Sequence, residues 1–341
     1  MKRFMTVVVS CVCCCCDVAA SSDPLIAGFQ RPPNSAKPWT YWFWINGNIT
    51  REGIAADLEA MARVGIHGVL IMEVARPKQM APTGPVAFGS PAWRELFRHA
   101  VAEAGRLGME INMNNDAGWT GSGGPWNTPE FSMQKLVSTS LAVHGPRRCE
   151  ETLPAAVQKF YRDIRVLAYP ASAAPADPIP ADRIIDLTSK MDAAGKLDWE
   201  VPAGHWIVQR IGHTSTGQMN LPAPEAGLGL ECDKLSAEAM RRHFEAFIGK
   251  LLDDVGPVAA RTLSLTHIDS WEVAGQNWTP RMAEEFSRRR GYDCTPWLIS
   301  LAGGPPVGSA ELVRRFQPAE VDIMFLIRGQ DPKQNCSLFH L

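Results

Sequence analysis

The chain has 341 residues, of which 45% are hydrophobic and 21% are charged, and its formal net charge at pH 7 is -2. This length is enough for one large domain or two ordinary ones with a full hydrophobic core. The near balance of charge gives no electrostatic reason to expect nucleic acid or an anionic membrane as a partner. The 11 tryptophans outnumber the 4 tyrosines, and they fit either a core or a site that binds sugars.

The N-terminus has the pattern of an export signal. Two basic residues follow Met1, residues 4–16 form a short apolar stretch, and Val18–Ala20 offer small residues for cleavage. The stretch is too short to cross a bilayer as a helix, and no later segment predicts a membrane span. We therefore expect residues 1–20 to be a signal peptide and the protein to be periplasmic or extracellular. Because Val8–Cys11 loosely fits a lipoprotein signal, a lipid anchor is the alternative.

The cysteines follow no known site pattern. Five of the 9 lie inside the predicted signal peptide. The other four show no CxxC pair and no histidine at zinc-ligand spacing: Cys149, Cys232, Cys294 and Cys336. Neither a zinc site nor a disulfide framework is predicted.

Residues 38–142 alternate between extended and helical patterns. Residues 38–45, with the sequence PWTYWFWI, are aromatic and predict a strand. A helix follows, begun by Thr50 as its N-cap and ended by Gly65. Residues 67–74 are almost continuously apolar, which is typical of a parallel strand that is covered on both faces.

A second helix and a third strand complete this part. Ser90 is an N-cap followed by proline at the first helical position, and Gly108 ends the helix. Its apolar residues recur at helical spacing: Trp93, Phe97, Ala100, Val101 and Ala104. Residues 109–114 predict the third strand. Successive strand–helix units of this kind indicate a parallel α/β sheet or barrel.

Residues 143–230 have a different composition. Proline and alanine become frequent, above all in residues 170–182, and the helical spacing disappears. Residues 183–217 fit short strands joined by turns that contain glycine and proline. We expect a small all-β insertion here.

The α/β pattern resumes after the insertion. Ser236 is the N-cap of another helix, residues 262–269 predict a fourth strand, and Thr279 begins a helix that ends near Gly291. The predicted fold class is therefore α/β, a partial (β/α)8 TIM-type barrel interrupted by a small all-β insertion. The predicted parts after the signal peptide are barrel, insertion, barrel and an atypical tail, at residues 21–142, 143–230, 231–316 and 317–341.

Polar residues follow all four predicted strands. They lie in NGN (46–48), at Glu73, in NNDAGWTGSGGPW (114–126) and in DSWE (269–272). In a (β/α)8 barrel the βα loops converge on one face, and catalytic groups come from these strand ends. We therefore expect Glu73, Asn114, Asp116 and Glu272 to lie on one face and border one cleft.

Each of these signals has a structural alternative. Residues 114–116 are common turn formers. Glu73 could equally be a buried acid that is satisfied by hydrogen bonds. The glycines within 121–124 lack the spacing of a phosphate-binding loop, so no phosphate role is expected. His213 and His267 fit structural roles better than ligand roles.

Two carboxylates, Asp269 and Glu272, stand beside Trp271 and Trp278 in the sequence HIDSWEVAGQNW. A flanking aromatic ring removes water from an acid and raises its pKa, which suits a proton donor. Glu272 is therefore a candidate general acid, and a satisfied structural acid is the alternative.

Four long segments carry a family resemblance. WFWINGNITREGIAADLEAMARVGIHGVLIMEV, NNDAGWTGSGGPW, GLECDKLS and DSWEVAGQNWTPRMAEEFSRRRGYD occur in this order between about residues 30 and 305. Together they resemble the N-terminal half of the family 106 glycoside hydrolases, the α-L-rhamnosidases. The resemblance implies a (β/α)8 catalytic barrel with β-rich accessory parts, and inverting hydrolysis of terminal α-L-rhamnose from a rhamnose-containing glycan. It also implies calcium that contacts the sugar, with ligands not identified, and Glu272 as the general acid.

The candidate site then includes one catalytic residue, Glu272, and a set of substrate-binding residues. The set is Glu73, Asn114, Asp116, Trp119, Trp126, Asp269, Asn277 and Trp278. An inverting enzyme also needs a second carboxylate to activate water, and in this chain only Glu73 or Asp116 could serve.

The sequence after residues 312–316 departs from the family pattern. We therefore expect a truncated or frameshifted fragment with an incomplete site, whose base lies outside it. Two other functions stay open: a barrel glycosidase with a different sugar specificity, and a carbohydrate-binding remnant without catalysis.

Overall fold

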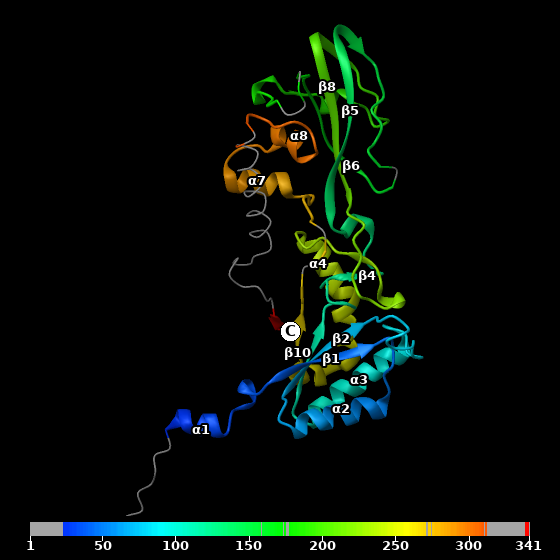
Figure 1. Ribbon diagram of the computed structural model, residues 1–341, viewed down its shortest axis with the longest axis vertical. Helices are drawn as coiled ribbons and strands as arrows, with labels where there is room; N and C mark the ends of the chain where they lie inside the picture. Colours follow the sequence, from blue (N-terminus) through cyan, green and yellow to red (C-terminus); the bar gives the residue numbers. More distant parts are fainter. Residues whose placement is uncertain are drawn as a thin grey trace, which may run out of the picture.

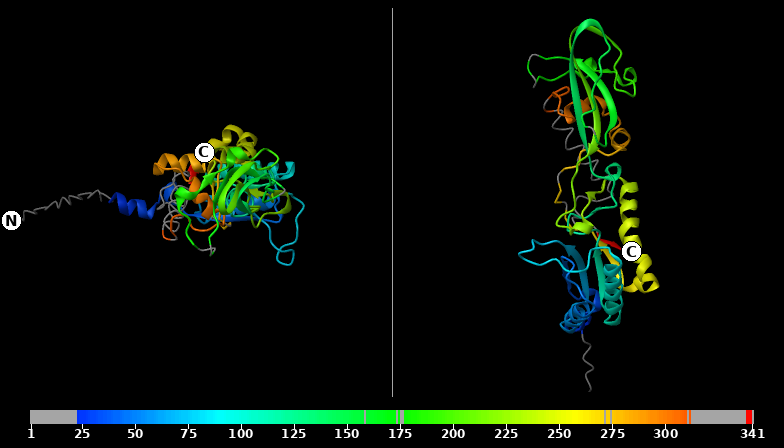
Figure 2. Two further views of the ribbon diagram at one scale, coloured as in Figure 1. Left: turned by 90° about the horizontal axis from the view of Figure 1, so that it is seen from above. Right: turned by 90° about the vertical axis from the view of Figure 1, so that its right-hand side faces the viewer.

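The computed structural model describes residues 23–311 and 338–340, except 158, 173, 175, 176, 271, 274 and 310. The predicted signal peptide and most of the predicted tail lie outside the described residues. The molecule is elongated, with a parallel sheet and its helices at one end and an antiparallel sheet at the other (Figures 1 and 2). A short helix, α1 (Pro24–Gln30), precedes the first sheet.

The first sheet contains four parallel strands in the order β1 (Trp39–Ile45), β2 (Gly68–Val74), β3 (Glu110–Asn114) and β10 (Leu263–His267). Each strand lies within two residues of its predicted position. The short strand β11 (Leu338–His340) pairs antiparallel with β10. Among the described residues the sheet is open, so it is a mixed α/β layer and not a closed barrel.

Helices cover one face of this sheet. They are α2 (Arg51–Arg63), α3 (Pro91–Arg106), and α4 (Ala237–Phe244), which runs on through a π-helical turn (Glu245–Gly249) into α5 (Lys250–Val255). The predicted N-caps are present, because Thr50, Ser90 and Ser236 each accept a hydrogen bond from a backbone N–H of the first turn. A short helix, α6 (Ala259–Thr262), leads into β10.

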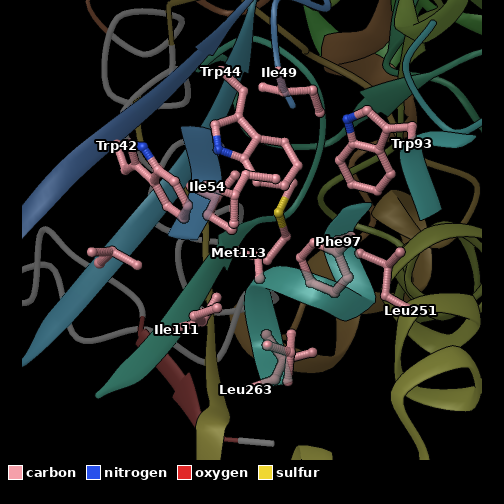
Figure 3. Close-up of a cluster of buried hydrophobic side chains, with 14 of the residues drawn as sticks. Trp42, Trp44, Ile49, Ile54, Trp93, Phe97, Ile111, Met113, Leu251 and Leu263 are labelled. Carbon is pink, nitrogen blue, oxygen red and sulfur yellow. The ribbon is translucent and has the colours of Figure 1, made fainter. Parts of the chain in front are cut away.

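The core between sheet and helices follows from strand alternation. On β1, Trp42 and Trp44 point to the helices and are buried, whereas Tyr41 and Phe43 point to the other face and are exposed. Trp93 of α3 packs edge-on against Trp44, with 5.6 Å between ring centroids. Figure 3 shows these rings beside the apolar residues of β3 and α5.

The antiparallel sheet has the order β5 (Gln134–Cys149), β8 (Trp199–Ser215), β6 (Arg162–Pro170) and β7 (Ile185–Asp186). A small two-stranded sheet, β4 (Gly123–Gly124) with β9 (Leu230–Glu231), connects it to the helical part. The antiparallel sheet begins at Gln134, earlier than the predicted boundary at residue 143. The reason is that β5 pairs with β8 along its whole length, from Gln134 opposite Ser215 onward.

The segment after β10 does not continue the parallel sheet as predicted. Helices α7 (Met282–Arg290) and α8 (Leu298–Leu301) instead pack against the antiparallel sheet. Trp278, Met282 and Phe286 form a hydrophobic cluster with residues of β5, β6 and β8. Within residues 231–311, α4 to β10 therefore belong to the parallel α/β part, whereas α7 and α8 bury their apolar residues against the other sheet.

The described helices are too short or too polar for any of them to traverse a membrane. Cys149, Cys232 and Cys294 are buried and unbridged, while Cys336 lies outside the described residues.

Candidate active site

Two loops lie side by side at the carboxyl ends of β3 and β10. The Asn115 N–H donates to the His267 carbonyl at 2.7 Å, and the Ser270 N–H donates to the Trp119 carbonyl at 3.0 Å. Gly121 has a φ of +96°, and a Cβ there would lie 2.7 Å from the Ile268 side chain. Only glycine therefore allows this close contact between the loops.

Glu272 lies exposed on the second of these loops. Its Oε2 accepts a hydrogen bond from Trp119 Nε1 at 3.0 Å. The Arg76 guanidinium lies over the same indole ring, 5.1 Å from its centroid. The structure therefore brings together the predicted residues Glu272 and Trp119 and adds Arg76, which sequence reading missed. Its position two residues beyond the end of β2 was the available signal.

The sequence predicts that Trp271 and Trp278 flank Glu272 and remove water from it. Trp271 lies outside the described residues. Trp278 is 3% exposed and belongs to the cluster around α7, where it packs beside His213. Trp278 therefore packs in this cluster, while the Trp119 indole donates a hydrogen bond to Glu272.

Asp269 connects the two outer parallel strands of the sheet, β10 and β1. Its Oδ1 accepts hydrogen bonds from His267 Nε2 at 3.0 Å and from the Tyr41 hydroxyl at 3.3 Å. Tyr41 is on β1, which is separated from β10 by two strands. In a flat sheet these strands would lie about 14 Å apart, so the contact requires the sheet to curve toward its helix-free face. Tyr41 stacks with Phe43 on this face, with centroids 5.9 Å apart.

Asn114 and Asp116 form a buried network inside the first loop. Asn114 Nδ2 donates to Asp116 Oδ1 at 2.8 Å and to the Gly118 carbonyl at 2.7 Å, and the Gly123 N–H donates to Asp116 Oδ2 at 2.8 Å. Both side chains are 0% exposed. The prediction that they border an open cleft is wrong here, because the loop folds over them and uses them as turn-forming residues.

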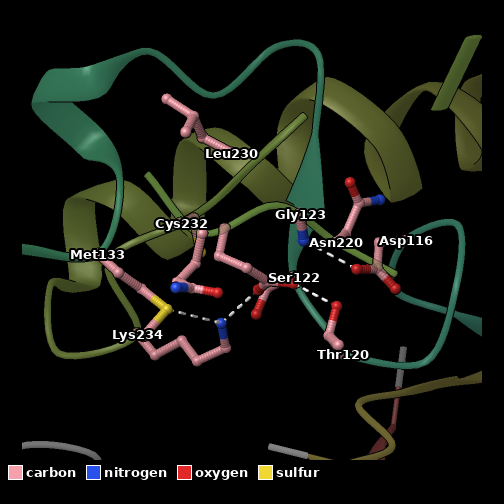
Figure 4. Close-up of polar contacts among 12 residues, drawn as sticks. Asp116, Thr120, Ser122, Gly123, Met133, Asn220, Leu230, Cys232 and Lys234 are labelled. Atoms are coloured by element: carbon pink, nitrogen blue, oxygen red, sulfur yellow. Dashed lines mark hydrogen bonds and ion pairs between the residues drawn. The ribbon is translucent and has the colours of Figure 1, made fainter. Parts of the chain in front are cut away.

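A buried ion pair lies next to this network (Figure 4). Lys234 pairs with Glu231, which also accepts a hydrogen bond from Thr120. Burial, followed by the nearby charge of Glu231, raises the pKa of Asp116 well above its usual value. Sequence reading noted this segment only as the motif GLECDKLS and assigned it no role.

Glu73 points into the helix layer and away from Glu272. It is opposite Trp44 in the strand register, it is 0% exposed, and its Oε2 accepts from Trp93 Nε1 at 2.9 Å. Burial raises its pKa to about 7, and the hydrogen bond from Trp93 partly opposes this shift. Glu73 is thus a buried, hydrogen-bonded acid, and the prediction that it borders the cleft is wrong.

Trp126 and Asn277 also have structural contacts. Trp126 Nε1 donates to His243 Nδ1 at 2.9 Å, which leaves His243 Nε2 to donate to the Asn115 carbonyl at 2.8 Å. Burial lowers the pKa of His243 to about 4, so the ring is neutral. Asn277 Oδ1 accepts from the Leu136 N–H at 2.9 Å and ties the chain to β5. These contacts hold loops in place.

The calcium that the resemblance implies would need several oxygen ligands. In the part of the chain that is described, no three or more histidine, cysteine, aspartate or glutamate side chains are grouped to hold a metal ion. Asp269 is already engaged by Tyr41 and His267. The calcium stays a prediction, because backbone and amide oxygens can also be its ligands, and no step of the chemistry is derived through the ion.

The chain is similar to known glycosidases. A protein of Formosa agariphila named "Putative beta-glucuronidase" is 38% identical over 322 residues, covering 86% of this chain and 27% of that protein. The structure of a rhamnosidase from Novosphingobium sp. PP1Y matches with a TM-score of 0.80 and 26% identity, covering 89% of this chain and 44% of that chain. The chain thus spans under half the length of either relative.

The family profile of the alpha-L-rhamnosidases matches residues 30–162 and 155–318. These ranges include all four parallel strands, both loops of the candidate site and the antiparallel sheet. The resemblance predicted from the four sequence segments is confirmed, and the chain belongs to glycoside hydrolase family 106, the alpha-L-rhamnosidase family.

Proposed function

We propose that the complete protein is an inverting glycosidase that removes terminal α-L-rhamnose from plant or bacterial polysaccharides, with Glu272 as its general acid. Family membership supports glycoside hydrolysis. The observation that carries the role of Glu272 is its position: the carboxyl is exposed beyond the end of β10 and is oriented by the Trp119 indole. A general acid must reach the glycosidic oxygen, and buried Glu73 and Asp116 have no such access.

The proposal includes a barrel around this site. The contact between Tyr41 and Asp269 supports it, because it requires curvature toward the helix-free face. Curvature in this direction, with helices outside and polar loops at the carboxyl ends, is the geometry of a (β/α)8 barrel. The exposed rings of Tyr41 and Phe43 would then face the barrel interior.

The catalytic base is proposed to lie outside the described residues. Inversion requires a second carboxyl about 6.5–9.5 Å from the first, with room for water between them. Glu73 faces the helices and Asp116 is enclosed by its own loop, so neither can receive that water. Asp269 is near the site but is held by two donors. Support by calcium and export from the cytoplasm are further proposals, which rest on the resemblance and on the N-terminal sequence.

A different sugar specificity is the second candidate. One relative is named as a glucuronidase, and Arg76 places a cation within the contacts of Trp119 and Glu272. A uronic acid would therefore be the alternative sugar. A carbohydrate-binding remnant without catalysis is the third candidate, supported by the lack of a free second carboxyl near Glu272 among the described residues.

Hydrolysis of two aryl glycosides separates these candidates. The chain extended by its natural downstream sequence should cleave p-nitrophenyl α-L-rhamnoside and leave p-nitrophenyl β-D-glucuronide intact. Proton NMR of the first product should show the β-anomer, as inversion requires. Cleavage of the glucuronide alone would support the second candidate, and retention would contradict the mechanism. The 341-residue chain should show weak or no turnover, and vigorous hydrolysis by it would place the base within it.

A further inference from the structure

A cavity of about 570 Å³ lies at the carboxyl ends of β1 and β2 and has no role in the proposed chemistry. It is formed between Asn46–Gly47 and residues of the 75–88 loop, with residues 224–226 along one side. Its volume is within the range of about 300–1,000 Å³ that is usual for small-molecule sites. It is therefore large enough to receive a sugar ring.

The cavity wall is held in a defined shape by Asn46. This residue has a φ of +52°, which is uncommon for a residue other than glycine and costs energy. Its Oδ1 accepts from the Arg76 N–H at 2.7 Å, and its Nδ2 donates to the Arg76 carbonyl at 2.9 Å. Asn46 thus engages both backbone polar groups of Arg76 and fixes where this side chain begins.

The opposite wall packs directly on Gly47. A Cβ at Gly47 would lie 2.1 Å from the Val86 carbonyl oxygen, and the Gly84 N–H donates to the Asn46 carbonyl at 2.8 Å. Asn48 Nδ2 donates to the Pro82 carbonyl at 2.6 Å. The NGN segment therefore holds the 75–88 loop against the end of β1. Because these contacts fix both walls, the cavity has a defined shape.

Arg76 connects the cavity to Glu272. Its guanidinium lies over the Trp119 ring, 5.1 Å from the centroid, and the N–H of the same ring donates to Glu272. Arg76 lines the cavity at the same time. A ligand in the cavity would therefore share Arg76 with the cluster that holds Glu272, the proposed proton donor.

The charges around the cavity favour an anion. Arg76 and Lys78 line it, against a single acid, Glu225, and the remaining wall includes apolar residues such as Phe88. An arginine presents paired N–H donors that match a carboxylate, and an apolar wall suits the C–H face of a sugar ring.

We propose that this cavity is a subsite for a carboxylate-bearing sugar, a uronic acid, recognised by Arg76 and Lys78. The inference rests on the proposed function in that Glu272 marks where the glycosidic bond is cleaved. The uronic acid would be the residue next to that bond, so it sets which glycans are used. Asn46 is a positioning residue that acts through Arg76.

The test is binding to the 341-residue chain, measured by calorimetry with two matched ligands, methyl β-D-glucuronide and methyl β-D-glucoside. They differ by the carboxylate. We expect the glucuronide to bind at least about tenfold more tightly at low salt, about 1.4 kcal/mol, and the preference to shrink as salt rises. Arg76→Gln should abolish the preference, Lys78→Gln should reduce it, and Asn46→Gly, which keeps the backbone conformation, should weaken it.

Arg63→Gln is the matched control, because Arg63 ends α2 and lies at the opposite end of the parallel strands. It should retain the full preference. Equal affinity for the two ligands, binding of neither, or a preference that survives Arg76→Gln would overturn the proposal. If the extended chain hydrolyses rhamnosides but does not bind the glucuronide, the subsite alone is refuted. If the extended chain binds the glucuronide but does not hydrolyse rhamnosides, the proposed function alone is refuted.

Discussion

Two polar clusters follow the same parallel sheet and differ in their exposure to solvent. The exposed cluster contains Glu272, Trp119 and Arg76, and it is held by one hydrogen bond and one cation–π contact. The buried cluster contains Asp116, Glu231 and Lys234, and nearly every polar atom in it has a protein partner. Trp119 and Asp116 come from the same loop after β3, yet only the exposed cluster can reach a glycan.

The difference teaches that a strand-end position does not by itself assign catalysis. A buried carboxyl with full hydrogen bonding stabilises the loop around it, and its removal should affect folding. An exposed carboxyl with a single partner contributes little to folding and is available for proton transfer. Stability and activity measurements should therefore separate the two clusters.

The largest effect on stability is expected from Lys234→Met. This change leaves the Glu231 carboxylate buried without its cation, which typically costs about 3–5 kcal/mol of unfolding free energy. Urea denaturation of the 341-residue chain measures it. Arg148→Met breaks the solvent-exposed pair with Asp198 and is the matched control, with little change expected. An equally small loss for Lys234→Met would mean that the buried cluster is not structural.

A smaller effect is expected from Glu73, which should make the unfolding free energy depend on pH. Its pKa is raised to about 7, whereas the unfolded chain loses this proton near 4.5. Between these pH values the folded state binds more protons than the unfolded state. The contribution of Glu73 to the unfolding free energy is therefore present below pH 4.5 and is lost as the pH rises to 7. At about 1.36 kcal/mol per pH unit this amounts to about 3 kcal/mol.

Denaturation of the parent chain and of Glu73→Gln across pH 4–8 isolates this contribution. Asp116 acts in the same direction and His243 in the opposite one, and both remain in the variant. The difference between the two curves should therefore fall with pH in this window. A difference that stays flat would show that Glu73 does not hold its proton in the folded protein.

The smallest effect is expected from Trp119→Phe, which keeps a ring beneath Arg76 and removes the N–H that holds Glu272. A hydrogen bond between neutral groups contributes about 0.5–1.5 kcal/mol, so kcat/KM of the extended chain should fall roughly 2- to 10-fold. The loss should lie in kcat and its pH profile, while the unfolding free energy changes little. Unchanged kinetics would remove Trp119 from the site.

The sequence predicted the elements well because their signals are local. Thr50, Ser90 and Ser236 cap helices as expected, and the parallel strands lie where apolar runs predicted them. The helix α7 was predicted correctly as a helix, but its packing partner was not, because amphipathic spacing does not say which sheet covers it.

The candidate site was predicted in part. Glu272, Trp119 and Asp269 lie on loops that meet, as the convergence of strand ends implied. Burial of Glu73 and Asp116 could not be inferred. The sequence pattern of a polar residue at a strand end is the same whether the side chain faces helices, its own loop or solvent. Tyr41 was missed because its contact with Asp269 depends on curvature across the sheet.

The most direct test of the central claim is the leaving-group dependence of Glu272→Gln in the extended chain, with Glu52→Gln on exposed α2 as the control. General acid catalysis contributes about 10²–10⁴-fold, so hydrolysis of an alkyl α-L-rhamnoside should fall within that range. Hydrolysis of p-nitrophenyl α-L-rhamnoside should fall far less, because this leaving group departs without a proton. Glu52→Gln should lose neither activity. Full activity of Glu272→Gln on the alkyl rhamnoside, or equal losses on both substrates, would contradict the assignment of Glu272 as general acid.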